Sequence, residues 1–533
     1  MKNHICIVFI ALIFLSTARG SSITVNPQYQ VVVVGSAPVG IQDLADVALG
    51  PRGKFFVAAS STGPNGPFTS VLTLPLTPGG VLQTYGTIEP NLSVYGVGSS
   101  NLSINAQGKI FLNTIFDGVL TDPVDSGGVL TIFAAAAGPG GRVGQISAAS
   151  DSSGHIYVVG TTASPSDAVL TDPSFLGGPL SVFGTTSSIS SGGPEATPDG
   201  RVFVSRSFGN GPGFFVLTNP PSVGGGLDVF GVSPSGLALI VTGLPAFVTD
   251  ATGHMFTVAS AADSTGIVLT DPVTPGGVLT IFGTAPAGIT LFPNPVINSQ
   301  GRLFFSALGA NVIFTNPQIP GGILQLFGSA PPEYFILTGR DHSVNPVDRE
   351  GNLFITGTDG QDNFTVFTDP AVPGGPLTPV ATFSNVTRVG NPSVDETGAI
   401  YVPVMSPDAP PAIYKFSVAL ITVNIDIRPG QDPAVINQKS KGQLTVAILS
   451  MATFDATSTV NRSSLTFGRT GTEHSLSSCD SLGTDVNGDG IPDLICHFSI
   501  SQANFQPGDT TGILKGLTNA NQAIVGDDTI VVH

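Results

Sequence analysis

The chain repeats one short phrase seven times at nearly even spacing. One clear copy is residues 268–282, which read VLTDPVTPGGVLTIF. The Gly-Gly pairs of the copies begin at Gly79, Gly127, Gly177, Gly224, Gly276, Gly321 and Gly374, so successive copies lie 45 to 53 residues apart. A period of roughly 50 residues built from short apolar strands is typical of a ring of similar sheets, a β-propeller.

A second element recurs between the Gly-Gly phrases, a turn that ends in Gly and is followed by an apolar strand with an aromatic residue. These turns end at Gly53, Gly108, Gly154, Gly200, Gly253, Gly301, Gly351 and Gly398, which makes eight hairpins against seven phrases. The eighth unit therefore lacks a final strand. Residues 30–41 (QVVVVGSAPVGI) closely parallel residues 279–289 (LTIFGTAPAGI) and can supply it.

These patterns predict an all-β chain. We expect an eight-bladed propeller over residues 24–419, closed by the N-terminal strand, with seven blades as the alternative if one unit is degenerate. Closure of this kind removes exposed sheet edges. After residue 420 the phrase disappears and alternating strands such as 422–427 and 444–449 begin, which predicts a separate small β-sandwich over residues 420–533.

The Thr-Asp-Pro part of the phrase has two interpretations. In the first interpretation the phrase forms a turn, because Asp accepts backbone N–H groups, Pro presets φ, and Gly allows positive φ. In the second, the aspartates bind ligands. The aspartates are Asp122, Asp172, Asp271 and Asp369, while Asn219, Asn316 and Leu74 stand at the same place in the other copies. This variation favours the turn interpretation.

The charge balance excludes some partners. The net charge is −17 with only 19 Lys and Arg residues, so a phosphate backbone and an anionic membrane surface would both be repelled. Charged residues make up only 10% of the chain, but 41% is hydrophobic, which argues against disorder. We expect neither nucleic acid nor a membrane span.

Residues 1–20 read as a secretory signal peptide. Lys2 precedes an apolar run of eleven residues from Ile5 to Leu15, which is too short to cross a bilayer. Small residues favour cleavage after Gly20, with Ala18 as the alternative. We therefore expect a secreted protein, in the extracellular space or the periplasm.

Removal of the signal peptide would leave two cysteines, Cys479 and Cys496. In an oxidising compartment they predict one disulfide, and two buried free thiols are the alternative. Five sequons for glycosylation occur, at Asn91, Asn101, Asn363, Asn385 and Asn461.

Residues 485–493 (DVNGDGIPD) carry oxygen-bearing side chains at the spacing of a calcium loop. The predicted ligands are Asp485, Asn487, Asp489 and Asp493, at loop positions 1, 3, 5 and 9, with Gly at position 6. Cys496 stands at position 12, where such loops carry an acid, so another oxygen such as that of Asp480 would have to complete the shell. The alternative is an Asp/Asn/Gly turn without metal.

Three resemblances follow from these residues. The hairpin element, most clearly residues 394–402, resembles the repeats of NHL-repeat and gluconolactonase-like propellers. The calcium loop resembles those of EF-hand-like and dockerin-type repeats. Residues 425–430, 436–437, 440–442, 446–449 and 454–455 resemble an accessory domain of secreted bacterial proteins, which implies a bacterial extracellular protein.

The resemblance to gluconolactonase-like propellers implies that a metal could lie at the channel mouth, held by acidic and amide side chains. The residues of this chain that could approach such a rim are Asp43, Glu195, Asn294, Asp341, His342 and Asn391. Other innermost strands start at Ala or Gly, which favours solvated loop residues over a catalytic centre.

We therefore expect a secreted binding or scaffold protein, with a calcium-stabilised accessory domain, that presents its propeller to an extracellular ligand, a glycan or a protein. An extracellular lactonase, lyase or glycan-cleaving enzyme that acts at the channel mouth is the alternative. Catalytic residues are not assigned. Three or more carboxylate, amide or imidazole groups within coordination distance would favour the enzyme.

Overall fold

The computed structural model describes residues 21–533 except 63–66, 91, 93, 95–101, 115–117, 136–141, 144–148, 162–166, 190–192, 209–212, 240–246, 294, 338–345 and 520–521. The predicted signal peptide and the sequons at Asn91 and Asn101 lie outside these residues. The chain divides into two compact units. Of the described residues, the first unit contains those of 21–25 and 31–416, and the second contains those of 26–30 and 417–533.

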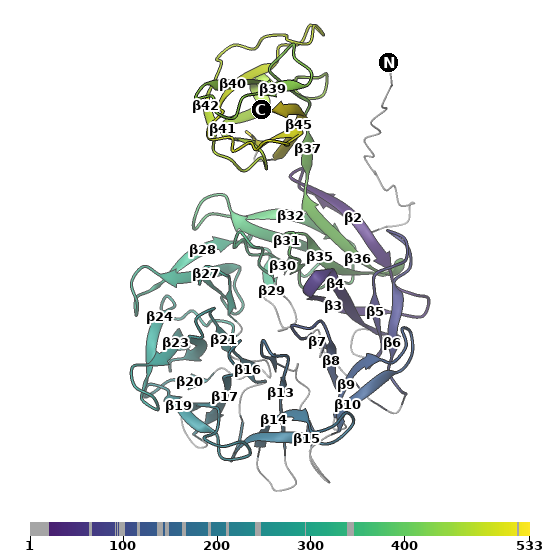
Figure 1. Ribbon diagram of the computed structural model, residues 1–533. Helices are drawn as coiled ribbons and strands as arrows, with labels where there is room; N and C mark the ends of the chain where they lie inside the picture. Colours follow the sequence, from purple (N-terminus) through teal and green to yellow (C-terminus); the bar gives the residue numbers. More distant parts are fainter. Residues whose placement is uncertain are drawn as a thin grey trace. The chain divides into compact units, whose positions relative to one another are not determined.

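The described strands of the first unit form eight antiparallel sheets around a ring (Figure 1). From the centre outward, sheets 1 to 4 are β3 (Asp43–Gly50), β4 (Lys54–Ser60), β5 (Phe68–Thr73) and β6 (Gln83–Thr87); β7 (Leu102–Ile104), β8 (Ile110–Asn113), β9 (Gly118–Pro123) and β10 (Leu130–Ala135); β11 (Arg142–Val143) with β12 (Ala149–Ser150), β13 (Ile156–Thr161), β14 (Asp167–Pro173) and β15 (Leu180–Thr186); and β16 (Glu195–Ala196), β17 (Val202–Ser207), β18 (Phe214–Thr218) and β19 (Asp228–Val232).

Sheets 5 to 8 follow the same order. They are β20 (Ala238–Leu239) with β21 (Phe247–Thr249), β22 (Met255–Ser260), β23 (Gly266–Pro272) and β24 (Leu279–Thr284); β25 (Val296–Ile297), β26 (Leu303–Ser306), β27 (Val312–Pro317) and β28 (Leu324–Ser329); β29 (Phe335–Leu337), β30 (Ile355–Thr358), β31 (Asn363–Pro370), β32 (Leu377–Ser384) and β1 (Ser22–Val25); and β33 (Arg388–Val389) with β34 (Ser393–Val394), β35 (Ile400–Ser406), β36 (Ala409–Val418) and β2 (Tyr29–Ser36).

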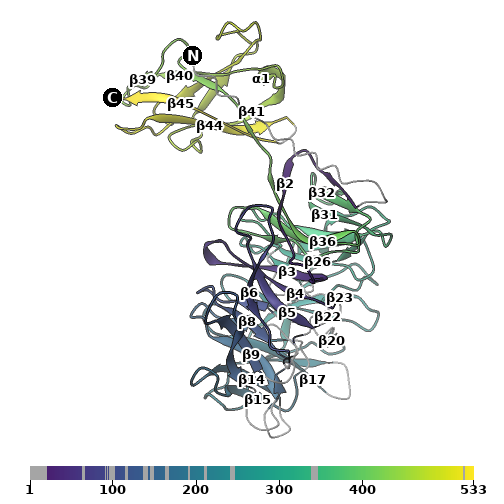
Figure 2. The same ribbon diagram turned by 90° about the vertical axis from the view of Figure 1, so that its right-hand side faces the viewer.

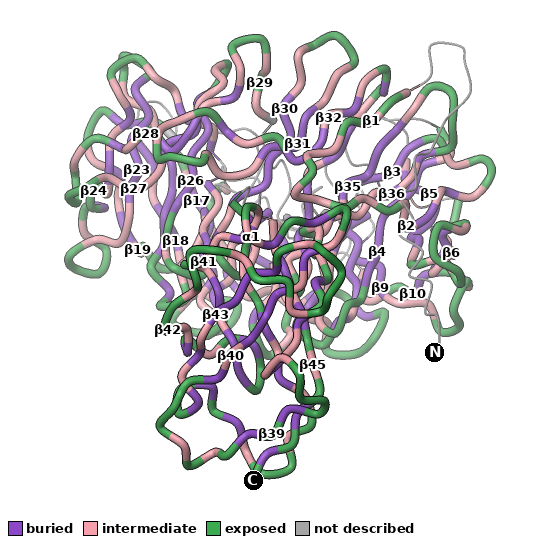
Figure 3. Tube along the Cα trace, turned by 90° about the horizontal axis from the view of Figure 1, so that it is seen from above, coloured by how far each residue is buried: buried purple, intermediate pink, exposed green. Residues whose placement is uncertain are grey.

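Apolar side chains fill the space between neighbouring sheets. The recurring aromatic residue of the second strand packs edge-on against an aromatic of the outer strand, as Phe256 does against Phe282 with ring centroids 5.1 Å apart. In Figure 3, buried residues run along the strands and exposed residues gather in the connecting loops. The core of this unit therefore consists of successive layers between sheets.

The Gly-Gly phrase joins each sheet to the one before it. Gly276 has a φ of 74°, and its N–H donates to the carbonyl of Phe230 at 2.9 Å. The carbonyl of Gly277 accepts the N–H of Val232 at 2.9 Å. Equivalent pairs recur at all seven phrases. The phrase thus covers the outer edge of the preceding sheet, which would otherwise expose unpaired backbone groups.

The predicted closure by the N-terminal strand is confirmed. β2 is the outer strand of sheet 8, next to β36 (Figures 1 and 2). The segment before it, β1, pairs with β32 from Ser22 opposite Ser384 to Val25 opposite Ala381. Sheet 8 has no Gly-Gly phrase to cover β32, so β1 occupies that edge instead. The repeat pattern of the sequence does not indicate this second role of the N-terminal segment.

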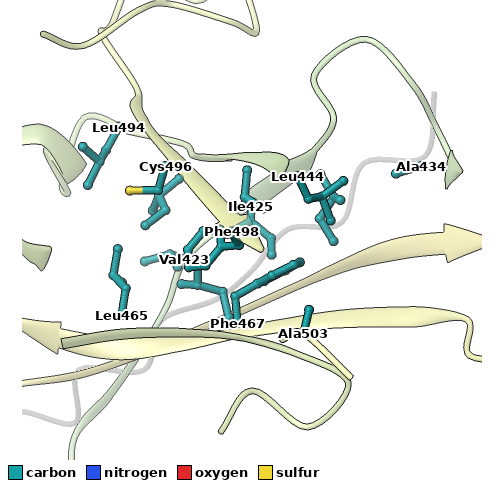
Figure 4. Packing of buried hydrophobic residues seen from close by; sticks show 14 of the residues in the cluster. Val423, Ile425, Ala434, Leu444, Leu465, Phe467, Leu494, Cys496, Phe498 and Ala503 are labelled. Carbon is teal, nitrogen blue, oxygen red and sulfur yellow. The ribbon is translucent and has the colours of Figure 1, made fainter. Parts of the chain in front are cut away.

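The second unit is a β-sandwich, as predicted. One sheet contains β37 (Leu420–Thr422), β45 (Ala523–Val532), β44 (Thr511–Thr518) and β41 (Val460–Gly468), with β39 (Ala434–Ile436) beside β45; the other contains β38 (Ile425–Ile427), β40 (Gln443–Ile448), β43 (Leu494–Ser499) and β42 (Leu476–Cys479). A short helix, α1 (Ala456–Thr459), precedes β41. The two sheets enclose one apolar core, in which Phe467 and Phe498 pack with centroids 4.9 Å apart (Figure 4).

Candidate functional site

The eight turns that end in Gly lie between the first and second strands of the sheets. We call them hairpins 1 to 8. Since the strands are antiparallel, turns alternate between the two faces of the ring, and the hairpins share one face with the Gly-Gly loops. We call this the hairpin face.

Most hairpins build themselves around the side chain of their first residue. In hairpin 5, Oδ1 of Asp250 accepts the N–H groups of Thr252 and His254, both at 2.9 Å. In hairpin 8, Asp395 accepts those of Thr397 and Ala399 at 2.8 and 3.0 Å. Burial acts to raise the pKa of Asp250, but the hydrogen bonds from Thr252 and His254 hold that pKa below its ordinary value. These carboxylates are therefore structural.

The Thr-Asp-Pro phrase is also structural, although not as a local turn. Oδ1 of Asp271 accepts the N–H of Met255 at 2.9 Å, and Oγ1 of Thr270 donates to the carbonyl of Met255 at 2.9 Å. The pair thus holds the first residue of β22 from the neighbouring strand. The same acceptor role falls to Asp122, Asp172, Asn219, Asn316 and Asp369. Asn can replace Asp because only one side-chain oxygen is needed.

Side chains of one hairpin also reach the backbone of the next. The bonds run from Lys54 to Gly108, Asn105 to Gly154, Ser152 to Pro198, Arg201 to Gly253 and Asn298 to Gly351, and an ion pair joins Arg349 to Glu396. Within the described residues, no such bond joins hairpin 5 to hairpin 6, or hairpin 8 to hairpin 1. The series of bonds between neighbouring hairpins is therefore interrupted at two places.

A cavity of about 620 Å³ lies where no such bond joins hairpin 8 to hairpin 1, and hairpins 1, 6, 7 and 8 line it. Its apolar lining comes from the ends of innermost strands and from two aromatic residues: Leu49, Ile297, Val347, Val394, Phe55 and Tyr401. Its charged lining comes from Arg52, Lys54, Asp348, Arg349, Asp395 and Glu396. No sequence pattern indicates this site, because four turns far apart in the chain form it.

Hairpin 1 departs from the pattern of the others. It begins with Gly50, where the other hairpins have Asn, Asp or Thr, and residues Pro51–Gly53 form a short 3-10 turn. A Cβ at Gly50 would lie 2.9 Å from Cγ2 of Ile104, so packing leaves no room for a side chain. Arg52 adopts left-handed backbone angles, with a φ of 60°, which costs about 1 kcal/mol for a residue other than Gly.

Two of the predicted channel residues, Asp43 and Asn391, belong to one buried cluster between sheets 1 and 8. Arg388 pairs with Asp43 at 3.2 Å, and Asn391 donates its N–H and Nδ2 to Asp46 at 2.8 and 2.7 Å. Burial raises the pKa of both Asp43 and Asp46, and the charge of Arg388 offsets part of that rise. The cluster ties the first sheet to the last.

Asp46 and Arg388 were not among the residues predicted for the channel. Asp46 stands four residues before the hairpin position Gly50, as Asn391 stands four before Asp395. Counting back from the hairpins would therefore have paired Asp46 with Asn391.

The other predicted channel residues do not join this cluster. Glu195 lies in β16, where burial raises the pKa of its carboxyl to about 8 despite a hydrogen bond from Thr249. Asn294, Asp341 and His342 lie outside the described residues. In the part of the chain that the structure describes, no three His, Cys, Asp or Glu side chains gather closely enough to hold a metal ion.

The predicted calcium loop is held by its own side chains. Asp485 accepts the N–H groups of Gly488 and Gly490 at 2.7 and 2.8 Å, and Nδ2 of Asn487 donates to Asp489 at 3.0 Å. All three of these residues are exposed. Their all-oxygen donor set fits a hard cation such as Ca²⁺.

Asp493 is fully buried and differs from the other predicted ligands. Its two oxygens accept the N–H groups of Ser450 and Val486 at 2.7 and 3.0 Å, which anchors the loop to the sandwich. Asp480 contacts Nε2 of His497 at 3.2 Å. A disulfide joins Cys479 to Cys496 on either side of the loop, the pairing that the sequence predicted.

The chain is thus a β-propeller protein with an appended β-sandwich. No protein-family model matches it, and no curated protein matches its sequence. Among the described residues, no helix is long and apolar enough to cross a membrane.

Solved structures similar to the chain are distant from it. One is YCF48 bound to D1 peptide, at 10% identity and a TM-score of 0.36, covering 67% of this chain and 96% of that chain. A fungal alcohol oxidase of the AA5 family in complex with copper has 12% identity and a TM-score of 0.34, covering 96% and 98%. The PQQ-bound aldose sugar dehydrogenase from Streptomyces coelicolor has 11% identity and a TM-score of 0.29, covering 68% and 99%. These likenesses assign no function to the chain.

Proposed function

We propose that the chain is a secreted binding protein that holds an extracellular ligand at the hairpin face of its propeller. The observation that supports this function best is the cavity of about 620 Å³ among hairpins 1, 6, 7 and 8. Its volume lies within the range of roughly 300–1,000 Å³ that is common for small-molecule sites, and its lining combines apolar walls with a few polar groups.

Secretion is part of the proposal. It is supported by the signal-like residues 1–20 and by the disulfide between Cys479 and Cys496, since disulfides persist in oxidising compartments. The resemblance of the hairpins to NHL-repeat propellers is compatible with a binding role.

Blocking the cavity tests the binding function. Ser299 is an exposed second residue of hairpin 6 that lines the cavity, and Ser299→Trp would fill part of it. Ala251 occupies the same turn position in hairpin 5 outside the cavity, so Ala251→Trp is the matched control. The mature chain, residues 21–533, is titrated with a panel of glycans and cell-wall fractions. Loss of a bound component in S299W but not in A251W supports the function, and equal binding by both variants contradicts it.

We also propose that the sandwich binds one Ca²⁺ at residues 485–493. Asp485, Asn487 and Asp489 would provide oxygens to the ion, while Asp493 anchors the loop through Ser450 and Val486. A ligand present at 100 times its Kd stabilises the folded state by about 2.7 kcal/mol. Calcium should therefore raise the melting temperature of the sandwich in the full mature chain, and Asp489→Ala should abolish the rise. Asp125→Asn, at an exposed Gly-Gly loop, is the control; a calcium effect that persists in D489A contradicts the site.

An enzyme of lactonase, lyase or glycan-cleaving type is the second candidate, and Glu195 is the observation that favours it. A carboxyl whose pKa is about 8 keeps its proton at neutral pH and can act as a general acid. Turnover of lactone or glycan substrates by the wild type that is lost in Glu195→Gln would support this function. Turnover that E195Q retains would exclude Glu195 from the chemistry.

A further inference from the structure

One positively charged side chain of the cavity on the hairpin face has no hydrogen-bond or ion-pair partner among the described residues. Of the cavity's charged residues, Lys54 bonds to the carbonyl of Gly108 and Arg349 pairs with Glu396. Asp348 and Asp395 accept N–H groups of their own hairpins. Arg52, in contrast, makes no hydrogen bond or ion pair with any described residue, and its side chain is exposed.

Arg52 also lies in the hairpin that differs most from the repeated pattern, hairpin 1. Among the hairpin residues that the structure describes, Arg52 is the one non-glycine residue with positive φ. The other hairpins keep a side-chain acceptor at their first position, whereas hairpin 1 has lost it at Gly50. In a repeat architecture, positions that keep the pattern serve the common fold. A departure that places an unpaired guanidinium at the cavity of about 620 Å³ is therefore a specific feature of this chain.

From these observations we infer that the cavity recognises a small ligand with an apolar body and a single carboxylate, which pairs with Arg52. This inference rests on the proposed binding function. The positively charged guanidinium offers a planar fork that matches a carboxylate in two parallel hydrogen bonds. Leu49, Val347 and Val394 provide the apolar wall for the rest of the molecule.

The other charges of the lining limit the ligand to one anionic group. Asp348, Asp395 and Glu396 balance the three cations of the cavity. A polyanion would place further negative charges against these carboxylates, at a cost that a single carboxylate on Arg52 avoids.

Two fluorescent probes that differ in one group test the inference. Dansylglycine has an apolar ring system and a carboxylate, while dansylamide lacks the carboxylate. We expect the mature chain to bind dansylglycine at least tenfold more tightly than dansylamide, and Arg52→Gln to remove that difference. Arg302→Gln, which replaces an exposed cation of hairpin 6 outside the cavity, should leave both affinities unchanged.

A second variant separates recognition from folding. Arg52→Gly places the residue that tolerates left-handed angles best at this position, so its melting temperature should equal or exceed that of the wild type. It should nevertheless lose the preference for dansylglycine. Retention of that preference in R52Q or R52G overturns the inference, as does the absence of saturable dansylglycine binding up to millimolar concentration. If S299W weakens both probes while R52Q has no effect, the binding cavity stands and only the role of Arg52 is wrong.

Discussion

The propeller and the sandwich reach stability in different ways. The propeller distributes its polar bonds over many equivalent positions, such as the Asp271–Met255 contact and its counterparts in other sheets. It contains no disulfide among its described residues. The sandwich concentrates its constraints at one loop, where Asp493 is buried and a disulfide joins the flanking strands. The loss of one repeated bond should therefore cost the propeller little, while one change at the loop should cost the sandwich much.

Closure of the ring differs from these repeated contacts because it depends on one segment, the N-terminal strands. Removing that segment should have the largest effect on the stability of the propeller. Deletion of residues 21–36 removes β1 and β2, so that sheet 8 loses its outer strand and β32 loses its cover. We expect the loss of most of the free energy of unfolding, about 5 kcal/mol or more. Thermal unfolding followed by circular dichroism measures it. Deletion of residues 21–25 alone should leave the ring closed but expose the edge of β32, and an unchanged transition in the longer deletion would disprove closure.

Glu195 should make the free energy of unfolding of the propeller depend on pH, by about 4 kcal/mol between pH 5 and 9. Its folded-state pKa of about 8 exceeds the ordinary value of 4.5. Its contribution is therefore complete below pH 4.5 and is lost as the pH rises through 8, since the unfolded carboxyl ionises first. Urea unfolding of the wild type and Glu195→Gln between pH 5 and 9 measures the difference, which should grow in favour of E195Q with rising pH. A difference that does not change with pH would show that the folded carboxyl is ionised.

The disulfide should give the next largest effect, confined to the sandwich. Its cysteines are 17 residues apart, and a loop of roughly 15 residues corresponds to about 3 kcal/mol. The double variant Cys479→Ser, Cys496→Ser should lower the melting temperature of the sandwich and weaken the proposed calcium binding, because the loop ends are no longer joined. The propeller transition should not move. Differential scanning calorimetry of the mature chain separates the two outcomes, and a shift of the propeller transition would contradict the comparison.

The smallest effect is expected at a single repeated position. Asp271→Ala leaves the buried N–H of Met255 without its acceptor and should cost about 1 kcal/mol. Asp271→Asn keeps the oxygen, as the chain itself does at Asn219 and Asn316, and should cost less than about 0.5 kcal/mol. Equal destabilisation by both variants, measured by urea unfolding, would indicate that the charge matters and not the acceptor.

Part of the fold could be predicted because its signals are local. The Gly-Gly phrases, the hairpins and the similarity of residues 30–41 to 279–289 were sufficient for the propeller and its closing strand. β1 could not be predicted, because Ser22–Val25 is too short to show a pattern and its place depends on an edge that lies more than 350 residues away. The buried polar cluster between sheets 1 and 8 could be predicted only in part. Asp43 and Asn391 were named for a shared rim, but their partners Asp46 and Arg388 were missed.

The sequence by itself determined the repeated sheets, because all seven phrases carry the Gly-Gly pair and six of them carry the Asp or Asn that accepts the N–H group of the neighbouring strand. Only the tertiary structure decided where the proposed binding cavity lies. The cavity among hairpins 1, 6, 7 and 8 exists because ring closure brings the start of the propeller next to its end. Arg52 looks in the sequence like any exposed turn residue. Its guanidinium is distinctive only in the folded protein, because the charged side chains of the neighbouring hairpins already have partners and that of Arg52 has none among the described residues.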